Sequence, residues 1–198
     1  MTDFIHLTNE QLALRYINGD NKAFDELLKR TQDRLYNYIL CIVKNTEIAN
    51  DIFQDTFVKV IDRLNRGQYA DSGLFQGWIM RIAHNLIMDY FRHNKSEKNV
   101  NVDSDIDITA FKCGIDVNSN SRESEIIYEQ TLTDVQKIMN LLPANQREVV
   151  YMRYFQDLSF KEIADITDVS INTALGRMRY AILNMRRIAK QYNVNTLT

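Results

Sequence analysis

Residues that favour tight turns are scarce in this chain. Among 198 residues there are one proline and six glycines. A sandwich or barrel built from many short strands needs more turn residues than this, and their scarcity leaves room for long uninterrupted helices. We therefore predict an all-α protein.

Cysteine is also rare, and long apolar runs are missing. Cys41 and Cys113 stand apart, with no CxxC pair and no cluster of histidines nearby. This pattern argues against a disulfide framework or a zinc site, so we expect no metal and no cofactor. No run of about 18 apolar residues is present, and Asp3, His6 and Glu10 make the first ten residues unlike a signal peptide. We expect a cytoplasmic protein without stable membrane insertion.

The net charge of -2 conceals an uneven distribution along the chain. Residues 1–95 carry 12 basic and 12 acidic side chains, residues 96–130 carry 3 and 8, and residues 131–198 carry 9 and 6. Residues 96–123 are rich in Asn, Asp and Ser and have no sustained helical period, which is typical of a flexible acidic linker. We predict a helical domain over 1–95, this linker, and a second helical domain over 124–198.

Apolar residues at three- and four-residue spacing predict four helices in the first domain. Thr8 and Gln11 have the spacing of a capping box at the start of the first helix. The expected ranges are about 8–18, Asn21–Val43, Glu47–Leu64 and Phe75–Asn94. Between the last two lies a polar loop, Asn65–Leu74, that contains Gly67 and Gly73.

The third helix has an acidic face opposite its apolar stripe. The residues that share this face are Asp51, Gln54, Asp55, Val58 and Asp62. One interpretation is a solvated flank, and the other is a docking surface for a basic partner.

The fourth helix has a basic stripe. At 100° per residue its members are Arg81, His84, Met88, Arg92 and Lys95. The stripe fits either a solvated face or contact with nucleic-acid phosphates. His84 has no second histidine at HxxxH spacing, so we expect neither a metal ligand nor a catalyst there.

The second domain has the pattern of a helix-turn-helix. Pro143 suits a helix start near Asn145, in a helix that ends near Tyr154. Ser159 and Glu162 form another capping box before a short helix over Phe160–Ile166, and a three-residue turn then leads to a helix capped by Ser170 that ends near Ala189. Two helices joined this tightly are typical of a DNA-binding helix-turn-helix.

The last helix is basic and contains one glycine. From Gly176 to Lys190 there are five basic residues and no acidic one, which favours contact with phosphates. Glycine costs a helix about 1 kcal/mol relative to alanine. Either the backbone approaches DNA closely at Gly176, or the glycine is a neutral feature of an exposed surface.

Four segments in this order resemble the extracytoplasmic-function (ECF) sigma factors of bacterial RNA polymerase. They read AFDELLKR, ANDIFQDTFVKVIDRL, FQGWIMRIAHNLIMDYFR and LPANQREVVYMRYFQDLSFKEIADITDVSINTALGRMRYAILNMRR. The resemblance implies two helical domains, no catalytic activity, and three partners: core RNA polymerase, promoter DNA and an anti-sigma factor.

The resemblance also assigns roles in the first domain. The third helix would dock on a coiled coil of the largest polymerase subunit through Asp51, Gln54, Asp55 and Asp62. The loop Asn65–Leu74 and the fourth helix would recognise the minus-10 promoter element and capture an unstacked base. The residues expected in this recognition are Tyr69 and Phe75 for base stacking, Asn85 for nucleotide contact, and Arg81, Arg92 and Lys95 for phosphates.

In the second domain the resemblance implies recognition of the minus-35 element in the major groove. The residues expected there are Ser170, Asn172, Thr173, Gly176, Arg177, Arg179 and Tyr180. The sequence departs from the usual pattern VxxGTVxSRxxRA: Asn172 replaces the glycine, Leu175 a basic residue and Gly176 the serine. At these positions a methyl or shape contact is as compatible with the sequence as a hydrogen bond.

Two other function classes fit the sequence less well. A polymerase-independent helix-turn-helix regulator explains residues 145–190 but leaves the acidic helix face and the glycine-flanked loop unused. A hydrolase built on Asp51 and Asp55 lacks a phosphate-binding glycine loop, a nucleophile–base pair and a metal cluster in the sequence.

The predicted linker contains four aspartates, Asp103, Asp105, Asp107 and Asp116. They fit either a passive spacer or an electrostatic role inside the polymerase.

Overall fold

The computed structural model describes residues 4–69, 75–97 and 134–192 of the chain. Every regular element within these ranges is a helix, which confirms the all-α prediction. The chain divides into two compact units, Met1–Ile106 and Asp107–Thr198. The division falls inside the predicted linker. Most of that linker lies outside the described residues, and residues 96–97 are the end of a helix.

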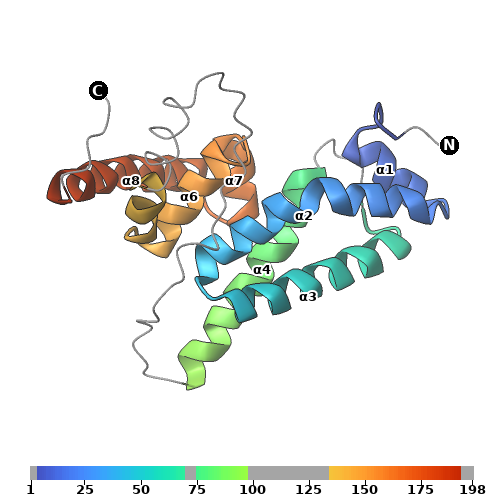
Figure 1. Ribbon diagram of the computed structural model, residues 1–198, viewed down its shortest axis with the longest axis horizontal. Helices are drawn as coiled ribbons and strands as arrows, with labels where there is room; N and C mark the ends of the chain where they lie inside the picture. Colours follow the sequence, from blue (N-terminus) through green and yellow to red (C-terminus); the bar gives the residue numbers. More distant parts are fainter. Residues whose placement is uncertain (1–3, 70–74, 98–133, 193–198) are drawn as a thin grey trace, which may run out of the picture. The chain divides into compact units, whose positions relative to one another are not determined.

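The first unit contains four described helices (Figure 1). They are α1 (Asn9–Ile17), α2 (Asn21–Val43), α3 (Thr46–Asn65) and α4 (Phe75–Glu97). Each of the first three begins at a polar N-cap side chain: Thr8 in the predicted capping box, Asp20, and Asn45. These oxygens accept backbone N–H groups that the helix itself leaves unpaired.

The core of the first unit forms where α2, α3 and α4 meet. Figure 1 shows the three helices side by side, with α1 along α2. Fully buried side chains come from all of them, including Leu12, Leu35, Ile39, Leu64 and Ile79. Burial of each such side chain is worth roughly 1.5–3 kcal/mol relative to exposure. This packing leaves one side of α3 and one side of α4 facing solvent.

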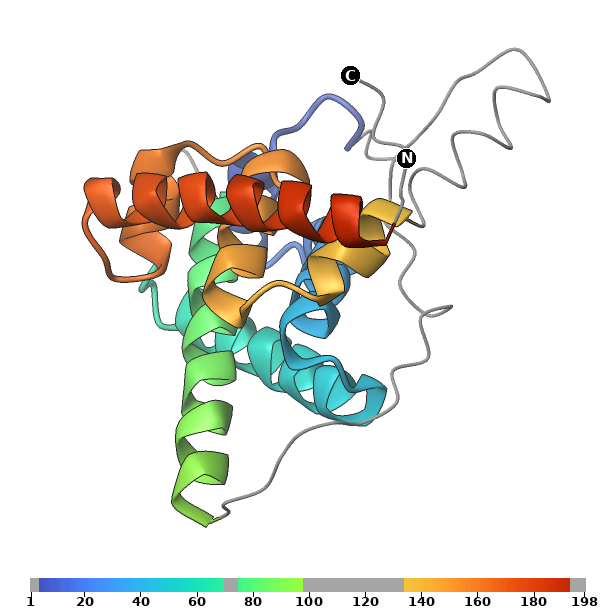
Figure 2. The same cartoon turned by 90° about the vertical axis from the view of Figure 1, so that its left-hand side faces the viewer.

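The second unit contains a helical stretch over residues 134–140, then α6 (Ala144–Tyr154), α7 (Phe160–Ile166) and α8 (Ile171–Gln191). In Figure 2, α6 and α7 (orange) pack along α8 (red). Their shared core includes Val150, Met152, Ile163, Ala174 and Ala181. The predicted first helix of this domain began at Ser124, and its part before residue 134 lies outside the described residues.

The capping box at the start of α7 and the tight turn between α7 and α8 both have the geometry that the sequence predicts. The Ser159 N–H donates to Glu162 Oε2 at 2.6 Å, and the Glu162 N–H donates to Ser159 Oγ at 3.3 Å. Asp168 then adopts a left-handed conformation with φ 51°, which reverses the chain before Ser170 caps α8. Aspartate tolerates this region better than most residues. The described part of the second domain is thus a helix-turn-helix.

No helix in the described parts of the chain is long and apolar enough to cross a membrane.

Candidate partner and nucleic-acid interfaces

The acidic face of α3 (Asp51, Gln54, Asp55, Val58 and Asp62) is exposed along its whole length. Val58, the apolar member of this face, is 64% exposed. The opposite side of α3 buries Ile52, Thr56 and Val60. The face therefore combines carboxylates with an accessible apolar contact and suits a basic partner better than a wholly polar flank would.

One member of this face has a partner within its own helix. Asp62 Oδ1 lies 2.9 Å from Arg66 Nε, one turn later, and both side chains are exposed. Ion pairs of this kind contribute only about 0.3–0.5 kcal/mol, so Asp62 remains available to an incoming partner at little cost.

The predicted basic stripe of α4 is only partly exposed. Arg81, Asn85 and Arg92 face solvent and Met88 is half-buried, whereas the side chain of Lys95 lies outside the described residues. Arg92 Nη1 lies 3.2 Å from Asp89 Oδ1, so an acid adjoins the stripe. Asn85, which was not among the predicted members of the stripe, is exposed beside it, as Arg81 is within it.

The prediction that His84 belongs to the basic stripe was wrong. This side chain is only 7% exposed, and its Nδ1 lies 3.5 Å from the buried hydroxyl of Tyr38 on α2. The residue falls at the border of the outer face, where α2 covers it. His84 therefore joins α2 to α4 in the core and is absent from the exposed side of α4.

Tyr69 and Phe75 flank residues 70–74, the half of the predicted minus-10 loop that lies outside the described residues. Phe75 is fully buried and Tyr69 is 6% exposed. Their rings meet edge to face at 5.6 Å, and each also packs against Trp78, at 5.0 Å from Tyr69 and 5.6 Å from Phe75. Neither ring presents an open face to a base, so the stacking role predicted for them does not fit this packed arrangement. The three rings join the chain before residues 70–74 to the start of α4.

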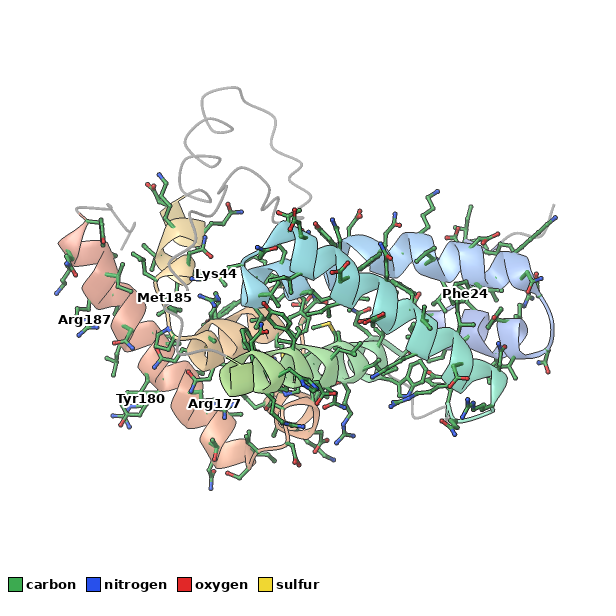
Figure 3. The ribbon with its side chains drawn as sticks, turned by 90° about the horizontal axis from the view of Figure 1, so that it is seen from below. Phe24, Lys44, Arg177, Tyr180, Met185 and Arg187 are labelled. Atoms are coloured by element: carbon green, nitrogen blue, oxygen red, sulfur yellow. The ribbon has the colours of Figure 1, made fainter. Side chains whose placement is uncertain are left out.

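The outer face of α8 carries most of the residues expected at duplex DNA. Asn172, Arg179 and Tyr180 are exposed, and Gly176 and Arg177 are partly exposed. In Figure 3, Arg177, Tyr180 and Arg187 all lie along this one helix. Two cations and an aromatic ring along one helix suit a phosphate backbone and base edges.

Hydrogen bonds between Ser170 and Thr173 stabilise the first turn of α8. Ser170 Oγ accepts the Thr173 N–H at 3.0 Å and lies 2.8 Å from Thr173 Oγ1. The two hydroxyls therefore pair with each other in the free protein. Their main contribution is to hold the helix N-terminus, whose N–H groups can in turn face a phosphate.

Some residues of α8 lie where the sequence did not place them. The apolar spacing of the α8 sequence predicts that Ile171 faces the core, but its side chain is 46% exposed, because the other helices do not cover the first residue of α8. Leu175 and Leu183 are also exposed. Leu175 had been singled out only as a departure from the family pattern, and its exposure makes it available for contact with a thymine methyl group.

Metal binding has no support in the described residues, which contain no group of three or more His, Cys, Asp or Glu side chains that could hold an ion.

Two family models match the chain in the order that the sequence segments suggest. The model "Sigma-70 region 2" matches residues 27–97, which contain the acidic face of α3 and the exposed side of α4. The model "Sigma-70, region 4" matches residues 132–177, which contain α6, α7 and the start of α8. Together they cover more than half of the chain.

Known proteins with both regions are similar over most of their length. The ECF RNA polymerase sigma factor SigM of Bacillus subtilis is 27% identical over 148 residues, which cover 75% of this chain and 83% of SigM. The ECF RNA polymerase sigma-E factor of Escherichia coli is 26% identical over 174 residues, which cover 87% of this chain and 89% of that protein.

Solved structures share the fold at lower identity. The sigma factor RpoE of Bartonella quintana, in a complex with the anti-sigma factor NepR, matches with a TM-score of 0.65 and 20% identity over 88% of this chain and 99% of its own. CnrH, in a complex with the cytosolic domain of CnrY, matches with a TM-score of 0.62 and 19% identity over 92% of this chain and 97% of its own. With both regions matched in order and relatives aligned over three quarters or more of its length, this chain belongs to the ECF sigma factors of RNA polymerase.

Proposed function

We propose that this protein binds core RNA polymerase, directs it to specific promoters and helps to open the DNA, without catalytic chemistry of its own. The observation that carries the proposal is the presence, in one chain, of an exposed acidic helix face and a separate basic helix-turn-helix. A regulator that only binds duplex DNA needs the second of these and not the first. We place this activity in the cytoplasm, with the two domains spanning about 1–95 and 124–198.

For the polymerase contact, the acidic face of α3 supplies the anchor. Its carboxylates attract a basic surface, and Val58 adds apolar area that becomes buried on docking. We assign Asp51, Gln54, Asp55 and Asp62 to this contact. The exposed, weakly paired state of Asp62 supports the assignment.

The two domains bind different forms of promoter DNA, single-stranded in the first domain and duplex in the second. In the first domain, we assign contacts with the opened minus-10 strand to Asn85 and to Arg81, Arg92 and Lys95. In the second, the exposed turns of α8 face the minus-35 duplex, with Arg177 and Arg179 on phosphates or bases. The capped N-terminus of α8 supports this docking, because its dipole favours the phosphate charge.

An anti-sigma factor is the third partner that we propose. The structures of CnrH with CnrY and of RpoE with NepR are complexes with another protein, and in the second the partner is an anti-sigma factor. A similar protein would bind this chain through the surfaces assigned above to polymerase and DNA and would prevent initiation while bound.

The test of the proposed function is reconstitution with bacterial core RNA polymerase. Run-off transcription on a library with randomised promoter sequence selects templates that depend on this protein, and co-purification measures its affinity for core. We expect stable co-purification and transcripts that require the protein. Duplex DNA binding without core binding would instead support a polymerase-independent regulator and overturn the proposal.

A further inference from the structure

The start of α4 is capped by a residue from a distant part of the sequence. Oε1 of Glu10, on α1, accepts the backbone N–H of Phe75 at 2.9 Å, across a separation of 65 residues. The first N–H groups of a helix have no partner within the helix. Leu74, which precedes Phe75 in the sequence, has no side-chain acceptor with which to cap them. Glu10 supplies an acceptor from another helix.

The interaction favours the charged form of Glu10. Burial by itself raises the pKa of this carboxyl, but hydrogen bonds from the Phe75 N–H, from its own backbone N–H and from the Thr8 side chain lower the pKa below its usual value overall. The negative charge also lies at the positive end of the α4 dipole, where acidic groups stabilise a helix. Glu10 is thus ionised at neutral pH at the start of α4.

The helix that carries Glu10 is itself held in place. Arg30, on α2, donates hydrogen bonds of 2.7 Å from Nη1 to the Leu7 carbonyl and from Nη2 to the Phe4 carbonyl, and its Nε bonds Glu26 at 2.7 Å. These bonds attach the segment just before α1 to α2. The position of the Glu10 carboxylate is therefore set by the body of the domain.

The Phe75 amide lies at a point that matters for the surface of α4. Its ring belongs to the buried cluster with Tyr69 and Trp78, so fixing its backbone also fixes this cluster. Arg81 and Asn85 follow on the same helix, six and ten residues later, on its exposed side. A rotation of α4 as a whole at this end would carry these side chains with it.

We propose that Glu10 is a positioning residue for promoter opening: by capping α4 from α1, it fixes the start of that helix and the orientation of its exposed nucleotide-binding side. This inference rests on the proposed function of the first domain. It adds α1, which the matched family region of residues 27–97 does not include, to the machinery for opening.

The test uses holoenzyme reconstituted with full-length variants on a promoter selected by the wild-type protein. E10A removes the acceptor, whereas E10Q retains Oε1 and loses the charge. We expect E10A to weaken binding of the single-stranded non-template minus-10 oligonucleotide by about fivefold, the effect of roughly one lost helix cap. We expect E10Q to recover most of this affinity, and both variants to bind core and minus-35 duplex like wild type.

A second measurement reports on the cap itself. In the free protein, amide hydrogen exchange at Phe75 should be faster in E10A than in wild type, with E10Q in between. Unchanged exchange at Phe75 in E10A would overturn the capping role.

The matched control is D20A, which removes the side-chain N-cap of α2 in the same domain. It lowers stability through a lost cap but leaves the start of α4 intact, so we expect minus-10 affinity within about twofold of wild type. Equal defects in D20A and E10A would reduce Glu10 to a general stabilising residue and overturn the proposal. If wild-type holoenzyme opens the promoter and E10A opens it equally, the inference fails while the proposed function stands. A wild-type protein without promoter-dependent transcription would instead remove the proposed function.

Discussion

The hydroxyl of Tyr38 on α2 lies 3.5 Å from Nδ1 of His84 on α4, and both side chains are buried. This polar contact lies between the two helices that form most of the core of the first domain. It fixes one face of α4 against α2, so that the other face, with Arg81 and Asn85, points outward. A core interaction thereby orients the surface assigned to nucleic acid.

We expect Y38F to lower the free energy of unfolding by about 0.5–1 kcal/mol. The typical net contribution of a hydrogen bond is about 0.5–1.5 kcal/mol, and a separation of 3.5 Å lies at the long limit for such bonds. Urea denaturation of the first domain measures the change. Y36F is the control, because Tyr36 lies on the same helix, is half-buried and packs edge-on against Phe53. Equal losses in the two variants would show that the contact with His84 contributes nothing specific.

Local signals predicted the helices of this protein well. The range Asn21–Val43 was predicted as found, since the apolar period of this segment is a local feature. Both predicted capping boxes, at Thr8 and at Ser159, are present. The acidic face of α3 was also predicted correctly as a shared face, because a 3.6-residue period places its members without knowledge of the tertiary packing.

The errors concern contacts between segments that are distant in the sequence. A helical projection places His84 near the outer side of α4 but contains no information that α2 covers it. The same limit applies to Ile171, which has apolar spacing but lies at an uncovered helix end. The cap from Glu10 to Phe75 joins residues that are 65 positions apart, and no local sequence pattern predicts it.

Charge reversal on the acidic face of α3 tests the polymerase contact. We expect the double variant D51K/D55K to bind core about tenfold or more weakly, because each substitution replaces an attraction to a basic surface by a repulsion. The melting temperature should stay close to that of wild type, since both side chains are exposed. Equilibrium binding to labelled core measures the effect.

The control for this pair is D25K/D33K, which changes the same charge on exposed positions of α2. It separates a local effect of the α3 face from an effect of net charge, and we expect core affinity near wild type. If D51K/D55K binds core as tightly as D25K/D33K does, the assignment of the acidic face of α3 to the polymerase contact is wrong.

The two DNA-binding surfaces should fail in different assays. We expect R177A to weaken binding of holoenzyme to double-stranded minus-35 DNA by about 1–3 kcal/mol, as for loss of one arginine contact to phosphate or base. N85A should leave duplex binding intact and reduce promoter opening, measured by permanganate reactivity of unpaired thymines. If N85A opens the promoter normally at saturating holoenzyme, the assignment of a nucleotide contact to Asn85 is wrong.

Gly176 offers a test of how closely α8 approaches DNA. A Cβ built at this position meets no other atom within 4 Å in the free protein, so packing within the domain does not require glycine. We therefore expect G176A to raise the free energy of unfolding of the second domain by about 1 kcal/mol through helix propensity. The usual pattern of relatives has serine here, so a Cβ fits their docking geometry, and we expect G176A to bind minus-35 duplex within about twofold of wild type.

A second variant, G176S, separates space from chemistry at the same position. Its hydroxyl can donate to or accept from a base edge or a phosphate, so we expect duplex affinity equal to or above that of G176A. Thermal denaturation gives the stability change, and fluorescence anisotropy with the selected minus-35 duplex gives the affinity. A similar loss of affinity in both variants, with stability raised in G176A, would mean that this α8 backbone lies against the DNA, too close for any Cβ.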